Sequence, residues 1–426
     1  MTQHSAPHPR VFALDKRAVA DKISRNVSAP LDWSPLCRRG GRENGHPREP
    51  GSSELTTVAA AAKRRQSLWT ELLRDQVPII GAVLIMGVAA SYLQHGFLVG
   101  GDRPFPLAGV TVPLWHLLWL GFWTGYTMAL VGEATGIFSL PYAMSILRFD
   151  NIHVSPTNLV ITVINPLGAL LGFRRAGQWN VDFALWPCLG ALIGSEAGPF
   201  IRVKYLSDPV PFKALVGLAL FWLGAHLVWE ITPWYLRKRD AQRLFLERFR
   251  ARAREAAEAG RLPSGIPEGA RIQTLERSWR HVRIGFLDQQ WNLSVPMLFA
   301  LGLGVGVVAS TFGVGGGFLM TPLLVTLFKL PIYVIVAATI PFVMLQSLVG
   351  LFSYLVVVPA LTGHYEPPEW AFGFLAAAPA VFGAWLAAKT QRFVPEAYLK
   401  LVAGVITGLG GLLYLINYFV RLPFRI

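Results

Sequence analysis

Apolar residues in this chain come in long uninterrupted runs, separated by short polar loops, from about residue 78 onward. A run of about 20 apolar residues is long enough to cross the hydrocarbon core of a bilayer as a helix. The pattern therefore predicts an all-α, polytopic transmembrane helical bundle. The expected spans are, in chain order, about 78–98, 112–131, a short third span through Pro141 to Leu147, 157–173, 183–201, 212–231, 295–312, 318–328, 332–358, 370–388 and 398–419.

Two segments interrupt this pattern with polar and basic residues, and they divide the chain into five parts. The first is the N-terminal segment, and the second opens with Arg237-Lys238-Arg239 and is expected to be mostly helical. We expect residues 1–75 to be a disordered basic cytoplasmic tail, 76–109 an extra transmembrane span with its loop, 110–235 a first transmembrane repeat, 236–292 an arginine-rich cytoplasmic loop and 293–426 a second transmembrane repeat.

Composition supports the interpretation as a membrane protein and argues against a nucleic-acid-binding protein. The chain is 53% hydrophobic and only 15% charged, and its mean hydropathy is +0.43. The formal net charge of +14 raises the question of nucleic acid. However, the basic residues concentrate in the two polar segments, as the positive-inside rule requires of cytoplasmic loops. We therefore expect a multi-pass protein of the cell (inner) membrane with a cytoplasmic N-terminus, and no nucleic-acid partner.

Cysteine and histidine usage predicts neither a metal site nor a cofactor. Cys37 and Cys188 lie in different kinds of segment and have no redox or metal-ligand spacing. The nine histidines form no paired cluster. Because no nucleophile, metal set or carboxylate pair has usable spacing, we expect no enzymatic activity.

Two glycine-containing segments lie inside the apolar part of the chain, at residues 132–136 and 313–317. Glycines in an apolar helix leave the backbone free to depart from helical geometry. Freed backbone groups at membrane depth must be buried in protein or line a wet cavity. The segments are therefore candidates for the two halves of a substrate site. Close packing of helices through small residues is the alternative interpretation.

A single sequence shift aligns the two glycine-containing segments and the residues that follow them. The shift that places Gly132 on Gly313 also places Gly136 on Gly317. It also places Pro141 on Pro322, Asn158 on Thr339 and Asn165 on Gln346; further along the chain, Gly194 and Gly383 look equivalent. Counting spans from a cytoplasmic N-terminus puts equivalent loops of the two halves on opposite faces of the membrane. This predicts an inverted repeat of five plus five spans after one extra N-terminal span, with glycine-broken helices near the midplane.

The chemistry of such a site would come from helix ends and amides. A helix start carries unpaired N–H donors and a partial positive charge, which suits a small anion. Lysine and arginine are not expected at the centre of any span, so helix ends are the expected cationic feature. The candidate substrate-binding residues are Gly132, Thr135, Gly136, Asn158, Asn165, Gly313, Gly315, Gly316, Gly317, Thr339 and Gln346. For the hydroxyls, hydrogen bonding to their own helix is the competing role.

Glu133 lies inside the first glycine segment, where a carboxylate would repel an anion unless it is protonated or paired. Burial would raise its pKa, so it is the candidate for proton coupling. Two other roles are open at this point: a cap on helix N–H groups, or a carboxylate in water at the cytoplasmic boundary.

The motif from Gly313 to Leu324 reads GVGGGFLMTPLL and resembles the GxGGGxxxxPxL signature of the sulfite exporter TauE/SafE family. Residues 157–159 and 173–177 also resemble that family's first repeat. The resemblance covers about residues 110–420; residues 132–136, which read GEATG, depart from it because they replace a glycine-rich motif like the one at 313–317. It implies secondary transport of small sulfur-containing anions such as sulfite and sulfonates, with protons as the coupling ion.

The function expected from the sequence is therefore secondary anion transport, with a small anion and the lipid bilayer as partners and a second copy of the chain as a candidate partner. The alternative is a membrane scaffold or sensor that docks a soluble protein on its basic loop at residues 236–292.

Overall fold

A computed structural model describes residues 70, 72–131, 136–175, 179–232, 271–286, 289–390 and 396–420. Its contacts divide the chain into two units, Met1–Ala61 and Ala62–Ile426, and all described residues belong to the second. Most of the predicted cytoplasmic tail, the residues from Gly132 to Thr135 and the first part of the arginine-rich loop, 236–270, lie outside the described residues. The expectations about those segments therefore stay predictions.

Helices account for nearly all of the described first half, and they follow the predicted spans closely. The elements are a π-helical turn η2 (Leu72–Gln76), α3 (Val77–His95), α4 (Leu114–Val131), α5 (Gly136–Pro141), a π-helical turn η3 (Tyr142–Ile146), α6 (Val154–Ile164), α7 (Pro166–Arg175), α8 (Val181–Tyr205) and α9 (Pro209–Glu230). The short third span is therefore built from α5 and η3, and the fourth span is two helices that meet at Asn165.

The described second half, apart from the segment before α12, is also mostly helical. Its elements are α12 (Val295–Phe312), α13 (Gly317–Phe328), α14 (Ile332–Phe352), a π-helical turn η4 (Ser353–Val357), α15 (Val358–Thr362), α16 (Trp370–Thr390) and α17 (Glu396–Val420). The bounds of α12 coincide with those expected from the apolar run. The glycine cluster is where α12 ends and α13 begins.

Local sequence explains where the helices begin and end. The Asn180 side chain accepts a hydrogen bond from the backbone N–H of Phe183, and Asp208 caps α9 in the same way through Val210. Proline occupies the first turn of α3, α9 and α12, where its missing N–H costs nothing. Gly96 ends α3 in the left-handed conformation that glycine adopts without strain.

Length and composition identify membrane-spanning candidates directly. Five helical stretches among the described residues are long and apolar enough to cross a membrane: Leu72–His95, Pro209–Glu230, Val295–Phe312, Ala338–Thr362 and Trp370–Ala387. Large apolar side chains such as Leu93 and Ile193 are exposed on the helices, which suits contact with lipid. The protein is therefore a mostly helical, multi-pass membrane protein. The count of eleven spans stays a prediction.

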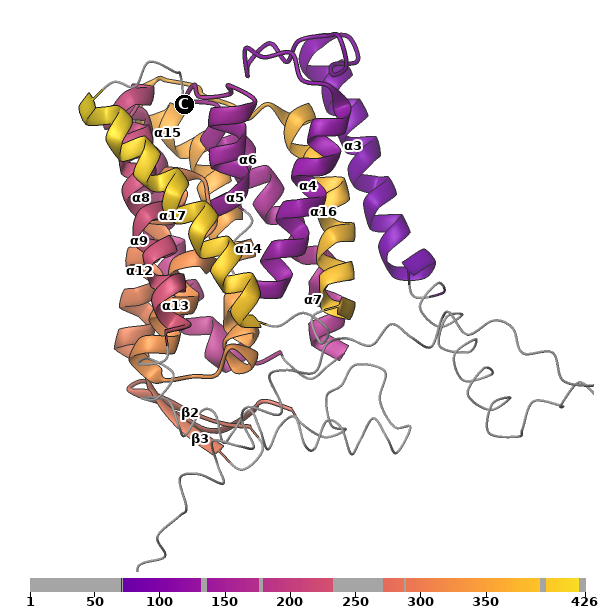
Figure 1. Ribbon diagram of the computed structural model, residues 1–426. Helices are drawn as coiled ribbons and strands as arrows, with labels where there is room; N and C mark the ends of the chain where they lie inside the picture. Colours follow the sequence, from indigo (N-terminus) through magenta and orange to yellow (C-terminus); the bar gives the residue numbers. More distant parts are fainter. Residues whose placement is uncertain are drawn as a thin grey trace, which may run out of the picture. The chain divides into compact units, whose positions relative to one another are not determined.

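Helices from the two halves pack against each other in pairs (Figure 1). Helix α4 packs along α16, α12 packs along α8, and α9 packs along α17. Helices α6 and α14 contact each other, and each also packs on a long helix of the other half: α6 on α16 and α14 on α8. The extra first helix, α3, lies against α16.

The prediction of a purely helical chain was wrong for residues 273–294. Three antiparallel strands, β1 (Gln273–Arg277), β2 (His281–Phe286) and β3 (Gln289–Ser294), form a sheet in the order β1-β2-β3. In β2, the side chains of Val282, Ile284 and Phe286 are buried and alternate with half-buried residues. That alternation is the period of a strand with one covered face.

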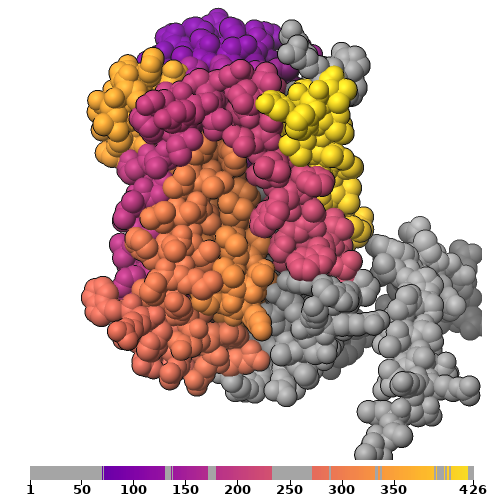
Figure 2. Space-filling view, turned by 90° about the vertical axis from the view of Figure 1, so that its left-hand side faces the viewer, coloured from indigo at the N-terminus to yellow at the C-terminus, as the bar shows by residue number. Residues whose placement is uncertain are grey.

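The sheet contacts one end of the helical part of the chain. Strand β3 leads directly into α12. Arg277 of β1 forms a 3.0 Å ion pair with Asp182, in the first turn of α8. In the space-filling view, the sheet lies directly below the helices of the second half (Figure 2). Residues at the other end of α8 therefore lie far from the sheet, because a helix of 25 residues is about 37 Å long.

Candidate functional site

The two glycine segments meet in space at Gly136 and Val314. A Cβ atom built on Gly136, the first residue of α5, would lie 2.3 Å from the carbonyl oxygen of Val314. This distance excludes any side chain at Gly136 unless the backbone moves. Gly132, Glu133 and Thr135 lie outside the described residues, so the structure places one member of the first segment, Gly136, directly against the second.

The second glycine segment is a sharp break between α12 and α13. Gly313 ends α12 with φ +73°, and Gly315 has φ +72°. An L residue with a side chain adopts this left-handed conformation only with strain, so the break depends on glycine. A Cβ on Gly313 would also lie 2.3 Å from the carbonyl oxygen of Ser155 on α6. The first half of the chain therefore packs directly on the break of the second half.

Asn158 joins the two halves at this point. Its side chain is buried, and its Nδ2 donates a hydrogen bond of 2.6 Å to the carbonyl oxygen of Gly313. Its Oδ1 accepts a hydrogen bond from the hydroxyl of Ser139 on α5. One amide thus holds α5, the short helix that starts at Gly136, and the backbone of the second glycine segment together.

Gln346 of α14 holds the other end of the second break. Its side chain is fully buried, and its Oε1 accepts a 2.8 Å hydrogen bond from the backbone N–H of Gly316, at the start of α13. Its Nε2 has no hydrogen-bond acceptor within the described part of the chain. A buried amide donor of this kind is available for an anion that reaches the break.

The remaining predicted residues are buried nearby. Thr339 lies two turns before Gln346, on the same face of α14, and is 2% exposed. Asn165 is fully buried at the junction of α6 and α7. Both side chains are therefore enclosed by protein rather than exposed at the surface of the helices.

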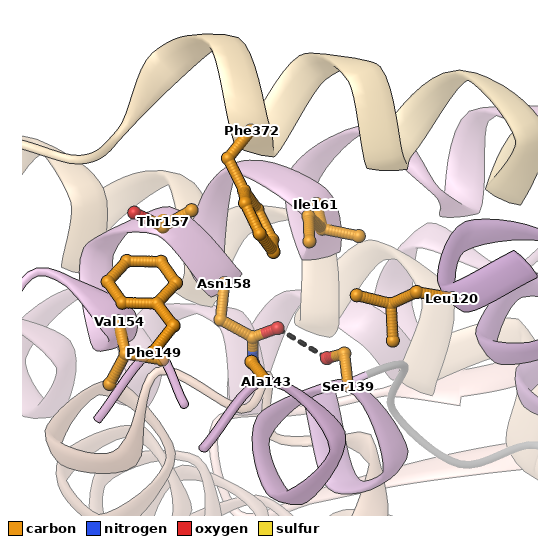
Figure 3. A pocket seen from close by; sticks show the side chains of 9 residues that line it. All are labelled: Leu120, Ser139, Ala143, Phe149, Val154, Thr157, Asn158, Ile161 and Phe372. Carbon is orange, nitrogen blue, oxygen red and sulfur yellow. Dashed lines mark hydrogen bonds between the residues drawn. The ribbon is translucent and has the colours of Figure 1, made fainter. Parts of the chain in front are cut away.

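A small cavity lies beside Asn158. It has room for about one water molecule. The cavity is lined by Leu120, Ser139, Ala143, Phe149, Val154, Thr157, Asn158, Ile161 and Phe372. Its wall is mostly apolar, and the polar groups of Ser139 and Asn158 hydrogen-bond each other within it (Figure 3).

Sequence analysis did not single out Arg202, a buried cation close to the second glycine segment. Arg202 lies in the last turn of α8, and its side chain is fully buried. Its Nε donates a 3.3 Å hydrogen bond to the hydroxyl oxygen of Ser155, the residue whose backbone contacts Gly313. The position of Arg202 directly after the apolar run of the fifth span is the one signal of it in the sequence.

Metal binding has no support among the described residues, where no group of three or more His, Cys, Asp or Glu side chains could hold an ion. The amides, hydroxyls and backbone N–H groups around the two breaks instead offer hydrogen-bond donors, which suit an anionic ligand.

Comparison with known proteins agrees with this chemistry. A family model described as "Sulfite exporter TauE/SafE" matches residues 67–227 and 117–414. No individual curated protein and no solved structure matches the chain. The resemblance carried by the GVGGGFLMTPLL motif is thereby confirmed, and the match begins earlier than expected, at residue 67, ahead of the extra N-terminal span. Since the match covers more than half of the residues, the chain belongs to the sulfite exporter TauE/SafE family, a family of membrane transporters.

Proposed function

We propose that the protein is a secondary active transporter that moves small sulfur-containing anions of the sulfite and sulfonate class across the cytoplasmic membrane. The substrate site lies between the two glycine segments, at residues 132–136 and 313–317. The transporter works by alternating access, and the N-terminus is cytoplasmic. Protons are the coupling ion, with Glu133 as the coupling group.

The observation that carries the proposal is the direct contact between the two glycine segments. They are far apart in sequence, yet a Cβ on Gly136 would clash with Val314. The polar groups that converge there come from both halves: Asn158 from the first, and Gln346 and the Gly316 N–H from the second. A site formed at the interface of two repeats is the arrangement that secondary transporters use.

Helix packing supports an inverted repeat. If α4 corresponds to α12 and α8 corresponds to α16, exchanging the halves converts the pair α4–α16 into the pair α12–α8. Both pairs are present. The same exchange converts the pair α6–α16 into the pair α14–α8, and both pairs are present. The pairs α9–α17 and α6–α14 are each converted into themselves, because their two helices correspond to each other.

Close backbone approaches within those pairs follow the same exchange. A Cβ on Gly121 would lie 1.9 Å from the carbonyl oxygen of Ala376, and one on Gly302 would lie 2.1 Å from that of Pro187. The shift that places Gly132 on Gly313 places Gly121 on Gly302, and the shift that places Gly194 on Gly383 places Pro187 on Ala376.

A second pair of equivalent close contacts involves Gly194 and Gly383. A Cβ on Gly194 would lie 2.1 Å from the carbonyl oxygen of Leu303, and one on Gly383 would lie 2.3 Å from that of Phe122. Phe122 and Leu303 are equivalent in the register of the glycine segments. Equivalent residues therefore make equivalent contacts at both interfaces, which favours a repeat over chance similarity of glycine-rich helices.

The position of one hydrogen bond between the halves supports alternating access. Asn158 belongs to the first half and holds the carbonyl of Gly313 in the second, so movement of one half against the other must break or remake this bond. The cavity beside Asn158 has space for about one water molecule and no larger ligand. This is the geometry expected of a closed conformation that opens when the halves move.

Flux measurements on purified protein in sealed vesicles test the proposal. We expect uptake of sulfite or a small sulfonate, and no uptake of a carboxylate of similar size. Replacing Asn158 with leucine should lower flux at least about tenfold, because a buried backbone carbonyl loses its donor at the site. A panel of sulfite, sulfonates and sulfate that shows no flux with wild-type protein would overturn the proposal.

The matched control is Asn151→Leu. The Nδ2 of Asn151 also donates to a backbone carbonyl, that of Leu107, but in a loop away from the glycine segments. This variant should keep wild-type flux per folded molecule. Coupling has a separate test, since Glu133→Gln should flatten the dependence of flux on the pH gradient. An unchanged pH profile removes Glu133 from the mechanism and leaves anion transport in place.

A further inference from the structure

Arg202 is a fully buried arginine at the end of α8 that lies away from the sheet. One side of its guanidinium group is accounted for: Nε donates to the Ser155 hydroxyl oxygen at 3.3 Å, and the plane of the group lies 3.7 Å from the ring centroid of Phe212. The terminal nitrogens Nη1 and Nη2 are buried, and no described residue accepts a hydrogen bond from either.

The electrostatic surroundings do not neutralise this charge by direct contact. Glu366 and Tyr354 interact with Arg202 electrostatically. However, the carboxylate of Glu366 is paired with His153 at 3.4 Å, and no described carboxylate lies within ion-pair distance of the Arg202 guanidinium. The side chain of Tyr354 is also fully buried, and its hydroxyl interacts with the hydroxyl of Ser155, the group that also accepts from Arg202. The two terminal nitrogens of Arg202 therefore lack an acceptor beside a buried tyrosine hydroxyl.

This cluster adjoins the second glycine break on two sides. Ser155, which accepts from Arg202, presents its backbone to Gly313. Phe212, which covers the guanidinium, packs edge-on against Phe312 with ring centroids 6.1 Å apart, and Phe312 is the last residue of α12 before the break. A change in the break would therefore be transmitted directly to the guanidinium group.

We propose that Arg202, Tyr354 and Ser155 form a binding subsite for the charged oxygen group of a small sulfur oxyanion, such as sulfite or the sulfonate head of an organic anion. The planar guanidinium fork matches two oxygens of such a group at once, and the Tyr354 hydroxyl donates to a third. The inference rests on the proposed function for the identity of the anion. It adds a fixed positive charge to a site for which the sequence predicted only helix ends and amides.

A purely structural role accounts for less of the geometry. Stacking on Phe212 and one hydrogen bond to Ser155 use one edge of the group and leave the other edge buried without an acceptor. Buried charges in proteins are normally paired and hydrogen-bonded, because desolvation opposes them otherwise. The enclosure of Arg202 fits a closed conformation, in which the anion reaches the subsite only when the two halves of the chain move.

Binding to the purified full-length protein in detergent tests the subsite without requiring transport. Calorimetric titrations with sulfite and with methanesulfonate would compare wild type, Arg202→Met, Arg202→Lys and Tyr354→Phe. We expect Arg202→Met to weaken binding about 10- to 100-fold, as the loss of hydrogen bonds to a charged group does. Arg202→Lys should weaken it by about tenfold, since the charge remains but the fork is lost. Tyr354→Phe should have an effect of about three- to tenfold.

The matched control is Lys204→Met, which removes an exposed cation two residues further along the same helix. It should change affinity less than about twofold, since an exposed charge is screened by water and salt. Sulfite affinity that is unchanged in Arg202→Met and in Tyr354→Phe overturns the subsite. Equal, Arg202-dependent affinity for chloride and sulfite overturns its assignment to oxyanions. If Arg202→Met does not fold, Arg202→Lys and Tyr354→Phe decide the matter.

The two proposals fail in distinguishable ways. Wild-type and Arg202→Met vesicles with equal sulfite flux would refute the subsite and leave transport standing. Arg202-dependent binding in detergent together with absent wild-type flux would support the subsite and refute transport.

Discussion

Two fully buried charged residues in this protein differ in their hydrogen bonding: one has partners for its charged group, and the other lacks them. Glu369, just before α16, and Arg202, in the last turn of α8, both have no exposed surface. The carboxylate of Glu369 is surrounded by donors: Nε2 of His95 at 2.6 Å and the backbone N–H groups of Leu107 and Ala108 at 3.0 and 3.4 Å. The Nη1 and Nη2 atoms of Arg202 have no acceptor within the described residues.

The position of Glu369 explains why its contacts are complete. His95 ends the extra first helix, Leu107 and Ala108 lie in the loop that follows it, and the backbone N–H of Glu369 donates to Thr157 on α6. A satisfied carboxylate therefore joins three separate parts of the chain. The carboxylate at this joint needs no ligand to complete its hydrogen bonds. Its contacts also do not depend on any movement of the chain.

The difference separates a structural charge from a functional one. Burial alone does not distinguish the two residues, because both have none of their surface exposed. The two residues differ in how completely their polar atoms are hydrogen-bonded. A buried charge whose polar atoms are all paired needs no further partner. A buried charge with free donors beside a glycine break is poised to accept a ligand. Substitutions at the two sites should therefore change different observables.

Glu369→Ala should have the largest effect on stability. Removing one partner of a buried, hydrogen-bonded pair costs about 3–5 kcal/mol, because His95 and two backbone N–H groups lose their acceptor. The thermal unfolding midpoint of the purified protein measures this loss. The control is Asp150→Ala, whose carboxylate is 42% exposed and pairs with Lys213 at 2.9 Å. An exposed pair of this kind is worth about 0–1 kcal/mol. Equal losses in both variants would contradict the interpretation of Glu369 as a joint.

Gly313→Ala tests the link between the break and the Arg202 subsite. A left-handed residue with a side chain costs about 1–2 kcal/mol, and the new Cβ would also lie 2.3 Å from the Ser155 carbonyl oxygen. Gly363→Ala is the matched control, because Gly363 has φ +72° with nothing within 4 Å of a Cβ. We expect the Gly313 variant to lose about twice as much stability as the control and to weaken sulfite binding. Equal losses of stability in the two variants would show that the Ser155 backbone moves away from the new Cβ without a cost in free energy.

Arg202→Met should have an effect of the opposite sign on stability in the absence of any anion. Replacing a buried charge with an apolar side chain of similar volume is often neutral or stabilising, by about 1–4 kcal/mol. The measurement is the unfolding midpoint with and without sulfite. Wild type should gain stability from sulfite, and the variant should not. A large loss of stability without anion would identify Arg202 as a structural charge like Glu369.

Much of the fold was predictable from the sequence, because a bilayer allows few solutions. Apolar runs must be helical to satisfy their backbones, so the bounds of α12, α13 and α17 follow the apolar runs to within a few residues. The sheet at residues 273–294 was missed. Its alternation is confined to one strand, β2, and arginines around it are typical of both helices and strands.

The candidate site was predictable in part. Gly313, Gly316, Asn158 and Gln346 were proposed from their spacing and residue type, and the structure joins Asn158 to Gly313 and Gln346 to Gly316 by hydrogen bonds. Arg202 was not found, because an arginine at the end of an apolar run usually reaches the interface. Only the packing of Phe212 and Ser155 around it encloses it, and such long-range contacts are not visible along the sequence.

Glu276, on β1 outside the helical spans, is the exposed reference for the comparison and should give the smallest effect. A hydrogen bond from His281 and the charge of Arg283 hold the pKa of its carboxyl below the usual value. A lowered pKa stabilises the folded state above the ordinary glutamate pKa of about 4.3, and the contribution is lost as pH falls through the lower folded value. Glu276→Gln should therefore change the unfolding midpoint slightly at neutral pH and not at all in acid. Because solvent and salt screen an exposed carboxylate, high salt should remove the difference; for Glu369→Ala, whose charge is buried, the same salt should leave the loss unchanged.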